Sequence, residues 1–159
     1  MSRYIVQNYM RSRVPKITDS ATLGEAIKML LDEGSNGLIV VSASEPDKVA
    51  GIVSSRNVIE AVVPDYLETD RSLGAFEAED VFLKRVKEVA GSPISNIMTT
   101  KVHAVKPTDT LMEAITLLSD KGIRQLPVVD DNEKLVGYIS RTDIRKALGD
   151  AIKEISHSS

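Results

Sequence analysis

Two short polar motifs, Ser140-Arg141-Thr142-Asp143 and Ser54-Ser55-Arg56-Asn57, carry residues whose types and spacing could do chemistry. In each motif a hydroxyl is followed three residues later by a carboxylate or an amide, and an apolar run precedes it. A carboxylate can accept hydrogen bonds from two neighbouring sugar hydroxyls, whereas an amide oxygen accepts less strongly. The N-terminus of a following helix favours a phosphate. The motifs therefore suggest a site for a phosphorylated sugar, with Asp143 as the stronger acceptor.

Three arginines could serve these motifs. Arg141 and Arg56 lie within the motifs, and Arg124 precedes the apolar run 126–129, the first of the two runs before the second motif. A guanidinium can donate two parallel hydrogen bonds to a phosphate. We therefore expect these side chains to reach a phosphate bound at the motifs.

The same spacing has a structural interpretation. Ser-x-x-Asp before a helix is also an ordinary N-cap arrangement, in which the two side chains bond to backbone N–H groups. Its occurrence at the same place in both halves of the chain favours a ligand role for Asp143, and both interpretations stay open for Asn57. A serine nucleophile is disfavoured because no histidine is near Ser140 and no Gly-x-Ser-x-Gly motif occurs.

Composition excludes several classes of function. The chain of 159 residues has no cysteine, which removes thiol chemistry and thiolate metal sites, and its two histidines are too few to indicate a metal centre. The net charge of −3 and the absence of tryptophan disfavour nucleic-acid binding. Neither a signal peptide nor an apolar run of about 18 residues is present, so we expect a cytoplasmic protein without a membrane span.

An internal repeat organises the chain. A shift of 88 residues, reduced to 86 after a longer turn in the first copy, pairs 17 identical residues over 47 positions. Chance similarity would pair about three. Under this alignment Ser54 matches Ser140, Asn57 matches Asp143, and Asn36 matches Arg124. Because only the second copy has the aspartate and the arginine, the two sites are predicted to be unequal.

Each repeat follows one order: strand, helix, strand, strand, helix. The predicted first strands are residues 15–18 and 103–106, and the hairpin strands are 37–41 with 49–53 and 125–129 with 135–139. The final helices are predicted to begin at Ser55 and Arg141, and the tail from Ile152 to Ser159 is predicted to extend the last one and then fray. The acidic tract 130–133 between two strands indicates a hairpin turn rather than a calcium loop.

The other helices are marked by their caps and apolar faces. Thr22 and Thr110, each followed three residues later by glutamate, predict N-caps, and Gly34 and Gly122 predict the ends. The first helix carries an apolar face made of Leu23, Ala26, Ile27, Leu30 and Leu31. Between the repeats, apolar residues at helical spacing predict a linker helix over 75–90, its face formed by Ala75, Ala78, Phe82, Val86 and Val89.

The repeats, with endings Gly137-Tyr138-Ile139-Ser140-Arg141-Thr142-Asp143 and Gly51-Ile52-Val53-Ser54-Ser55-Arg56-Asn57, resemble a tandem pair of CBS domains, called a Bateman module. The first ending matches the family closely and the second less completely. The resemblance implies an α/β fold of two βαββα modules packed about a pseudo-twofold axis. It implies a first module over residues 1–63, a helical linker over 64–93 and a second module over 94–159.

The resemblance also implies a ligand and its contacts. Members of the family bind adenosine-bearing ligands, and their terminal motif holds the ribose or phosphate, which carries over to Ser140 with Asp143 and to Ser54 with Asn57. The family's base-contacting positions carry over to Val102 and His103, and to Val14 and Pro15.

On this basis the sequence predicts a regulatory protein rather than an enzyme. AMP, ADP or ATP is the expected ligand, with no prosthetic group, and the expected role is that of an energy sensor which signals to a protein partner. The family commonly forms homodimers, so a disc of four modules is expected. The alternative is a ligand-independent dimeric scaffold for protein interaction, and S-adenosylmethionine, NADH or nucleic acid are less favoured ligands.

Overall fold

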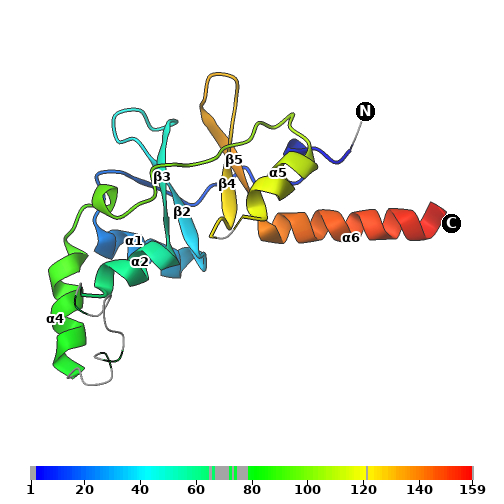
Figure 1. The fold of residues 1–159 in the computed structure, drawn as a ribbon. Helices are drawn as coiled ribbons and strands as arrows, with labels where there is room; N and C mark the ends of the chain where they lie inside the picture. The colour runs from blue at the N-terminus through cyan, green and yellow to red at the C-terminus, as the bar shows by residue number, and fades with distance from the viewer. Residues whose placement is uncertain are drawn as a thin grey trace. The chain divides into compact units, whose positions relative to one another are not determined.

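The computed structural model describes residues 3–64, 66, 72, 74, 79–120 and 122–158, and it shows the mixed α/β fold that the sequence predicts (Figure 1). The elements follow in the order η1 (Val6–Asn8), β1 (Lys16–Thr18), α1 (Leu23–Glu33), β2 (Gly37–Val41), β3 (Val49–Ser54), α2 (Ser55–Val62), α4 (Glu79–Ala90), η3 (Ile94–Asn96), α5 (Leu111–Leu118), β4 (Gln125–Val129), β5 (Leu135–Ser140) and α6 (Arg141–Ser158).

The chain forms two compact units. Unit 1 contains Met1–Val14, Asp47–Val49 and Lys101–Ser159, and unit 2 contains Pro15–Pro46 and Ala50–Thr100. Each repeat has a lead-in segment before its first strand, residues 3–14 in the first repeat and 91–100 in the second. Each unit therefore combines the main part of one repeat with the lead-in segment of the other.

In unit 2, three strands form a sheet in the order β1-β2-β3. β1 runs parallel to β2, with Ile17 opposite Val40. All five residues of β2 are buried, as expected for the continuous β-branched and leucine run Gly37–Val41 at the centre of a sheet. The bounds predicted for this strand are confirmed.

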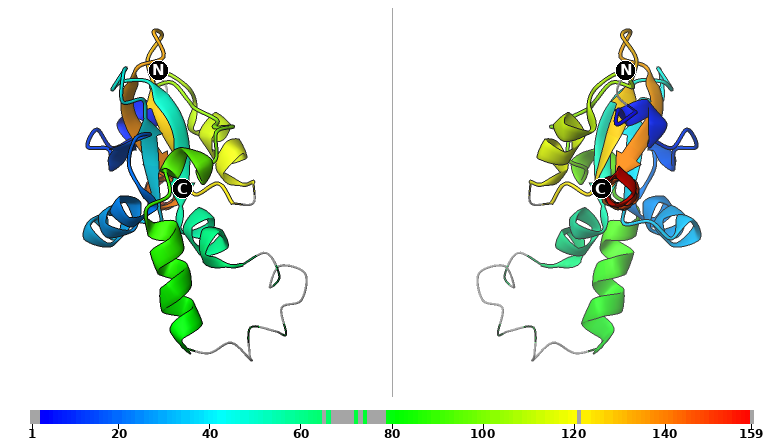
Figure 2. Two further views of the ribbon diagram at one scale, coloured as in Figure 1. Left: turned by 90° about the vertical axis from the view of Figure 1, so that its left-hand side faces the viewer. Right: turned by 90° about the vertical axis from the view of Figure 1, so that its right-hand side faces the viewer.

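The helices of unit 2 begin and end for reasons visible in the sequence. The Thr22 hydroxyl accepts a hydrogen bond from the Glu25 backbone N–H at 3.2 Å, and Gly34 ends α1 in the left-handed conformation, as predicted. α4 packs against α1 and α2, and both views of Figure 2 show it beside them. The predicted apolar faces are only partly right because Leu31 and Phe82 are exposed. Residues 75–78 of the predicted linker helix lie outside the described residues.

In unit 1, β4 and β5 form an antiparallel hairpin with Leu126 opposite Ile139. The turn is stabilised by Asp130, whose Oδ1 accepts hydrogen bonds from the backbone N–H groups of Asn132 and Lys134, each at 2.9 Å. The strand predicted at 103–106 is wrong in length, since only Val105 pairs with Val128 in a parallel bridge.

Of the two helices of unit 1, α5 is shorter than predicted, whereas α6 follows its prediction. α5 begins after the predicted cap, where Thr110 accepts from the Glu113 N–H at 3.2 Å, but it ends at Leu118, before the predicted end at Gly122. α6 continues to Ser158, so the predicted extension of the tail is confirmed.

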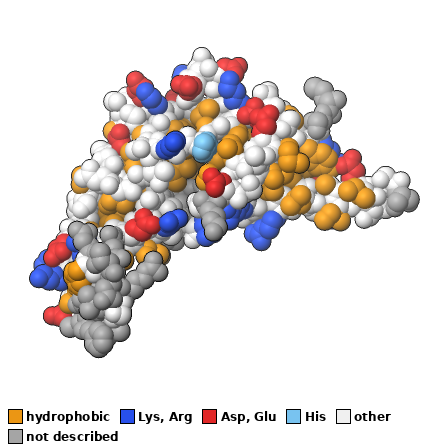
Figure 3. Space-filling view, in the orientation of Figure 1, with side chains coloured by type: hydrophobic (Ala, Val, Ile, Leu, Met, Phe, Trp, Pro, Cys, Tyr) orange, Lys and Arg blue, Asp and Glu red, His pale blue; other side chains and the backbone are white. Residues whose placement is uncertain are grey.

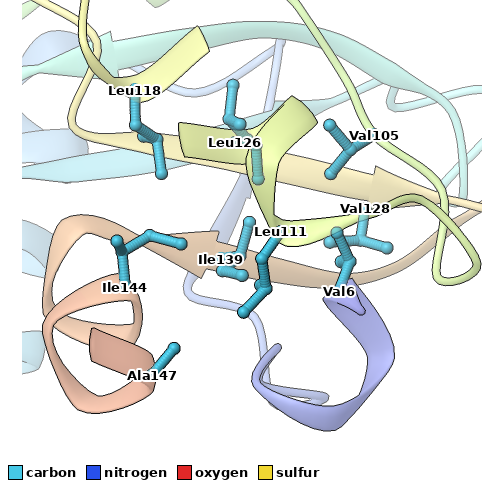
Figure 4. Close-up of a cluster of buried hydrophobic side chains, with 10 residues drawn as sticks. Val6, Val105, Leu111, Leu118, Leu126, Val128, Ile139, Ile144 and Ala147 are labelled. Carbon is cyan, nitrogen blue, oxygen red and sulfur yellow. The ribbon is translucent and has the colours of Figure 1, made fainter. Parts of the chain in front are cut away.

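Each unit has its own hydrophobic core. In unit 1, Figure 4 shows Val6 of η1 in one cluster with Leu111, Val128 and Ile139, and all four side chains are nearly inaccessible to solvent. In unit 2, Ile94 of η3 is equally buried, in a cluster with Leu38 and Val53. One apolar residue of each lead-in segment is therefore part of the core formed by the other repeat.

Among the described residues, no helix combines the length and the apolar character needed to cross a bilayer.

Candidate ligand-binding site

The lead-in segment of the first repeat lies directly on the strand that carries the second motif. Arg11 and Tyr138 exchange two backbone hydrogen bonds, at 2.8 and 2.9 Å. This approach requires Gly137, because a Cβ atom there would stand 2.6 Å from the Arg11 carbonyl oxygen. The glycine of the Gly-x-x-Ser motif thus allows the backbone contact that brings the Arg11 side chain to the end of β5.

Asp143 is the best-positioned acceptor of the second motif. It is 5% exposed, and its Oδ2 accepts hydrogen bonds from the Ser140 backbone N–H at 2.9 Å and the Ser140 hydroxyl at 3.0 Å. Its Oδ1 accepts from Arg11 Nε at 2.9 Å. The carboxylate therefore caps α6 and pairs with a guanidinium at the same time.

These bonds limit what Asp143 can offer a ligand. Each carboxylate oxygen has about two acceptor directions, so Oδ2 is saturated and Oδ1 keeps one. By this count, Asp143 can accept one ribose hydroxyl in addition to its present hydrogen bonds. The second hydroxyl needs another acceptor, or Arg11 must release its bond.

Arg11 is a permanent cation beside this carboxylate. The hydrogen bond and the charge of Asp143 raise the pKa of Arg11 above that of an ordinary arginine. Its side chain is 51% exposed, and the guanidinium lies over the Tyr138 ring, 6.0 Å from the centroid. The site thus combines one buried carboxylate with a guanidinium that solvent can reach.

The first motif has the same backbone plan with different side chains. Ile52 exchanges two backbone hydrogen bonds with Thr99, which the repeat places opposite Arg11, and a Cβ at Gly51 would stand 2.7 Å from the Thr99 carbonyl oxygen. Asn57 Oδ1 accepts from the backbone N–H and the hydroxyl of Ser54, both at 2.9 Å.

These bonds leave the first motif with a free hydrogen-bond donor instead of a free acceptor. Two bonds saturate the amide oxygen of Asn57, while its Nδ2 donates to Thr99 Oγ1 at 3.5 Å and retains a second N–H. The first motif therefore presents a donor where the second motif presents an acceptor.

The three predicted arginines have different surroundings. Arg141 donates from Nη2 to the Asp120 carbonyl oxygen at 3.2 Å, and Arg56 pairs with Glu60 at 2.9 Å one turn along α2. The Arg124 carbonyl accepts from the Arg141 backbone N–H at 3.2 Å, which fixes Arg124 beside the start of α6. Its exposed side chain has no hydrogen bond or ion pair within the part of the chain that the structure describes.

The predicted base-contacting residues lie at the ends of the lead-in segments. Val102 is half-buried and His103 exposed in unit 1, where Val14 is half-buried as well, whereas the half-buried Pro15 belongs to unit 2. The Pro15 carbonyl accepts from the Ile39 backbone N–H at 3.2 Å. Within unit 1, the structure brings together Ser140, Asp143, Arg141 and the backbone of Arg124.

Sequence reasoning missed Arg11. It lies 132 positions from Asp143, and no local motif joins the two. The shift of 88 residues sets Arg11 opposite Thr99, directly after the matched pair Met10 and Met98, but this match alone does not place either residue beside its motif.

Comparison with known proteins agrees with this repeated architecture. The family model of the CBS domain matches residues 6–64 and 94–150, which together make up most of the chain. The chain belongs to the CBS domain family. An uncharacterized protein of Methanocaldococcus jannaschii, MJ1426, is 31% identical over 114 residues, covering 71% of this chain and 68% of the relative.

Solved structures of CBS pairs share the fold. CBSX2 from Arabidopsis thaliana in complex with AMP is similar with a TM-score of 0.67 and 24% identity, over 92% of this chain and 97% of that one. The CBS domain pair of MJ0100, in complex with 5′-methylthioadenosine and S-adenosyl-L-methionine, has a TM-score of 0.66 and 21% identity, over 91% and 98%.

Proposed function

We propose that this CBS pair is a regulatory protein, not an enzyme, which binds an adenine nucleotide (AMP, ADP or ATP) at the Ser140–Asp143 motif. The observation that carries the proposal is the buried Asp143 carboxylate, which keeps one acceptor direction for a ribose hydroxyl beside cationic side chains. CBS pairs of similar fold bind AMP, S-adenosylmethionine and 5′-methylthioadenosine, which supports an adenosine-bearing ligand.

Each proposed contact has a chemical role. Ser140 and Asp143 hold the ribose, Arg124 and Arg141 hold the phosphate, and Val102 with His103 contact the base. The first motif provides a second, weaker site made of Ser54, Asn57, Arg56 and Pro15, all of which belong to unit 2. It is weaker because Asn57 offers no free acceptor oxygen and Arg56 is engaged by Glu60.

Binding regulates a partner only when the ligand has different affinities for two states of the protein. We therefore infer that nucleotide occupancy shifts the chain between two forms, one of which a protein partner recognises. In that role the protein acts as an energy sensor, and two copies associate as a homodimer.

Calorimetry and thermal unfolding with AMP, ADP, ATP, S-adenosylmethionine and NADH test this function. At 100 times its dissociation constant, the ligand should stabilise the wild type by about 2.7 kcal/mol. Asp143→Ala and Arg124→Ala should weaken binding more than Asn57→Ala does. Equal losses would show equivalent sites.

The competing function is that of a ligand-independent scaffold. In both motifs the Asn57 or Asp143 side chain already bonds to its own serine, so these hydrogen bonds form without a ligand. A wild-type protein whose thermal unfolding is unchanged by all five compounds would support the scaffold and refute the nucleotide proposal.

A further inference from the structure

Arg11 can contact two groups at once. Its hydrogen bond to Asp143 uses Nε, and the N–H groups of Nη1 and Nη2 are not needed for that bond. The half-exposed guanidinium lies over the Tyr138 ring, and the backbone of Arg11 is fixed by its two hydrogen bonds with Tyr138. An arginine fixed in this way loses little conformational freedom when its outer N–H groups meet an anion.

The charges around the second motif favour an anion. Three guanidinium groups, on Arg11, Arg124 and Arg141, are associated with the end of β5 and the start of α6. Two negative charges offset them in part: the Asp143 carboxylate and the exposed carboxylate of Asp120, which follows the end of α5. The local balance is positive even though the chain as a whole carries a net charge of −3.

The matching place in the first motif has no such cation. Thr99 stands where Arg11 stands, Asn57 is neutral, and the charge of Arg56 is balanced by Glu60. The two motifs have equivalent backbone hydrogen bonds with their lead-in segments. They differ in charge at the residue of the lead-in segment beside the motif, which is Arg11 in one and Thr99 in the other.

We propose that Arg11 binds the phosphate of the nucleotide and makes the Asp143 motif select a phosphorylated adenosine over adenosine itself. The inference rests on the proposed function and deepens it. Nε stays on Asp143 while Nη1 and Nη2 donate to two phosphate oxygens, the bidentate geometry that guanidinium groups favour. The last acceptor direction of Asp143 Oδ1 takes a ribose hydroxyl. Adenosine makes the ribose contact but leaves the outer face of Arg11 without an anion.

Titration calorimetry of AMP and of adenosine tests the inference, because the two ligands differ by the phosphate alone. In the wild type, AMP should bind about 10- to 100-fold more tightly, the range expected for hydrogen bonds to a charged group. Arg11→Thr, which copies Thr99, should lower this AMP-to-adenosine affinity ratio at least about tenfold. Arg11→Lys keeps the charge without the planar fork and should lower the ratio by less.

Arg145→Gln is the matched control. It removes a guanidinium from α6 two positions after Asp143, where Arg145 contacts Thr142, and should leave the ratio unchanged. Arg11→Gln, which removes the charge but keeps an N–H donor for Asp143, replaces Arg11→Thr if circular dichroism shows that the threonine variant does not fold.

The outcomes separate this inference from the function beneath it. If both ligands bind and the ratio is the same in wild type and Arg11→Thr, the nucleotide function stands and the role of Arg11 is refuted. An equal gain in affinity for both ligands also refutes it, since Arg11 would then only block Asp143. If the wild type binds neither ligand, the proposed function fails and the inference fails with it.

Discussion

The Arg11–Asp143 pair joins a buried carboxylate to a half-exposed guanidinium, so its contribution to stability lies between those of surface and buried ion pairs. We expect a double-mutant cycle of Arg11→Gln and Asp143→Asn, measured by urea unfolding, to give a coupling free energy of about 1 kcal/mol. The coupling should decrease at high salt. Because pairing with Asp143 raises the pKa of Arg11, the contribution of its charge to stability is complete below the ordinary pKa of an arginine and is lost only as the pH rises through the raised pKa.

A coupling free energy of zero would contradict this prediction, since Asp143 would then be held by Ser140 alone. Asn57→Ala is the control for the loss of a helix cap without the loss of an ion pair, because Asn57 also bonds to its N-cap serine. The control should lower stability by about 1 kcal/mol and show no salt dependence.

The local part of the site was predictable from the sequence, and the long-range part was not. Ser140 and Asp143 are three residues apart, and the spacing alone indicates that they meet at a helix start. The structural and the ligand-binding interpretations of this spacing are compatible. Asp143 bonds to Ser140 at the start of α6, and its Oδ1 keeps one acceptor direction for a ribose hydroxyl. Arg11 could not be found this way, since its position depends on how the lead-in segment pairs with β5.

Glycine has opposite effects in β5 and α6. A Cβ at Gly137 would stand 2.6 Å from the Arg11 carbonyl oxygen, whereas a Cβ at Gly149 meets nothing within 4 Å. We expect Gly137→Ala to destabilise unit 1 by about 1 to 3 kcal/mol through overpacking. Gly149→Ala, the matched control in the same unit, should stabilise α6 by about 1 kcal/mol. Urea unfolding measures both, and equal effects of the two changes would contradict the prediction.

The strand predicted over 103–106 and helix α5 are shorter than predicted, and in both places polar side chains form hydrogen bonds with backbone groups. Directly after Val105, the Lys106 N–H donates to Asp109 Oδ2 at 2.8 Å and the Lys106 carbonyl accepts from the Asp109 N–H at 3.0 Å, so the chain turns where the predicted strand would end. In α5, the hydroxyls of Thr116 and Ser119 bond to helix carbonyls at 2.7 Å, and the helix ends four residues before Gly122. These bonds depend on local geometry that the apolar pattern does not encode.

The proposed homodimer needs an apolar surface, and α6 provides one in unit 1. Leu148, Ile152 and Ile155 repeat at helical spacing and are 52%, 64% and 68% exposed, and Figure 3 shows hydrophobic side chains along this helix. We expect Ile152→Glu to shift a dimer toward monomer in sedimentation velocity. His157→Glu, a charge of the same sign on the opposite face of α6, is the control. A wild type that is monomeric at high concentration would refute the dimer.

The exchange of lead-in segments makes each unit depend on the distant repeat. The Val6 N–H donates to the Asp109 carbonyl and the Ile94 N–H to the Ala21 carbonyl, both at 2.9 Å, so the two lead-in segments dock in the same way. Burial of each apolar side chain contributes about 1.5 to 3 kcal/mol. A residue near the N-terminus should therefore stabilise elements more than a hundred positions later, which the order of the repeats along the chain does not suggest.

Hydrogen exchange can test this dependence with two crossed variants. Val6→Ala should lower the protection of β4, β5 and α5 by about 2 kcal/mol, while Ile94→Ala should lower that of β1, β2 and α1 by about 2 to 4 kcal/mol. Each variant serves as the control for the other, because each leaves the core cluster of the other unit intact. Loss of protection in β2 rather than β4 on Val6→Ala would mean that the lead-in segment stabilises its own repeat. The position of Arg11 beside Asp143 would then lose its structural basis, because the same segment carries both Val6 and Arg11.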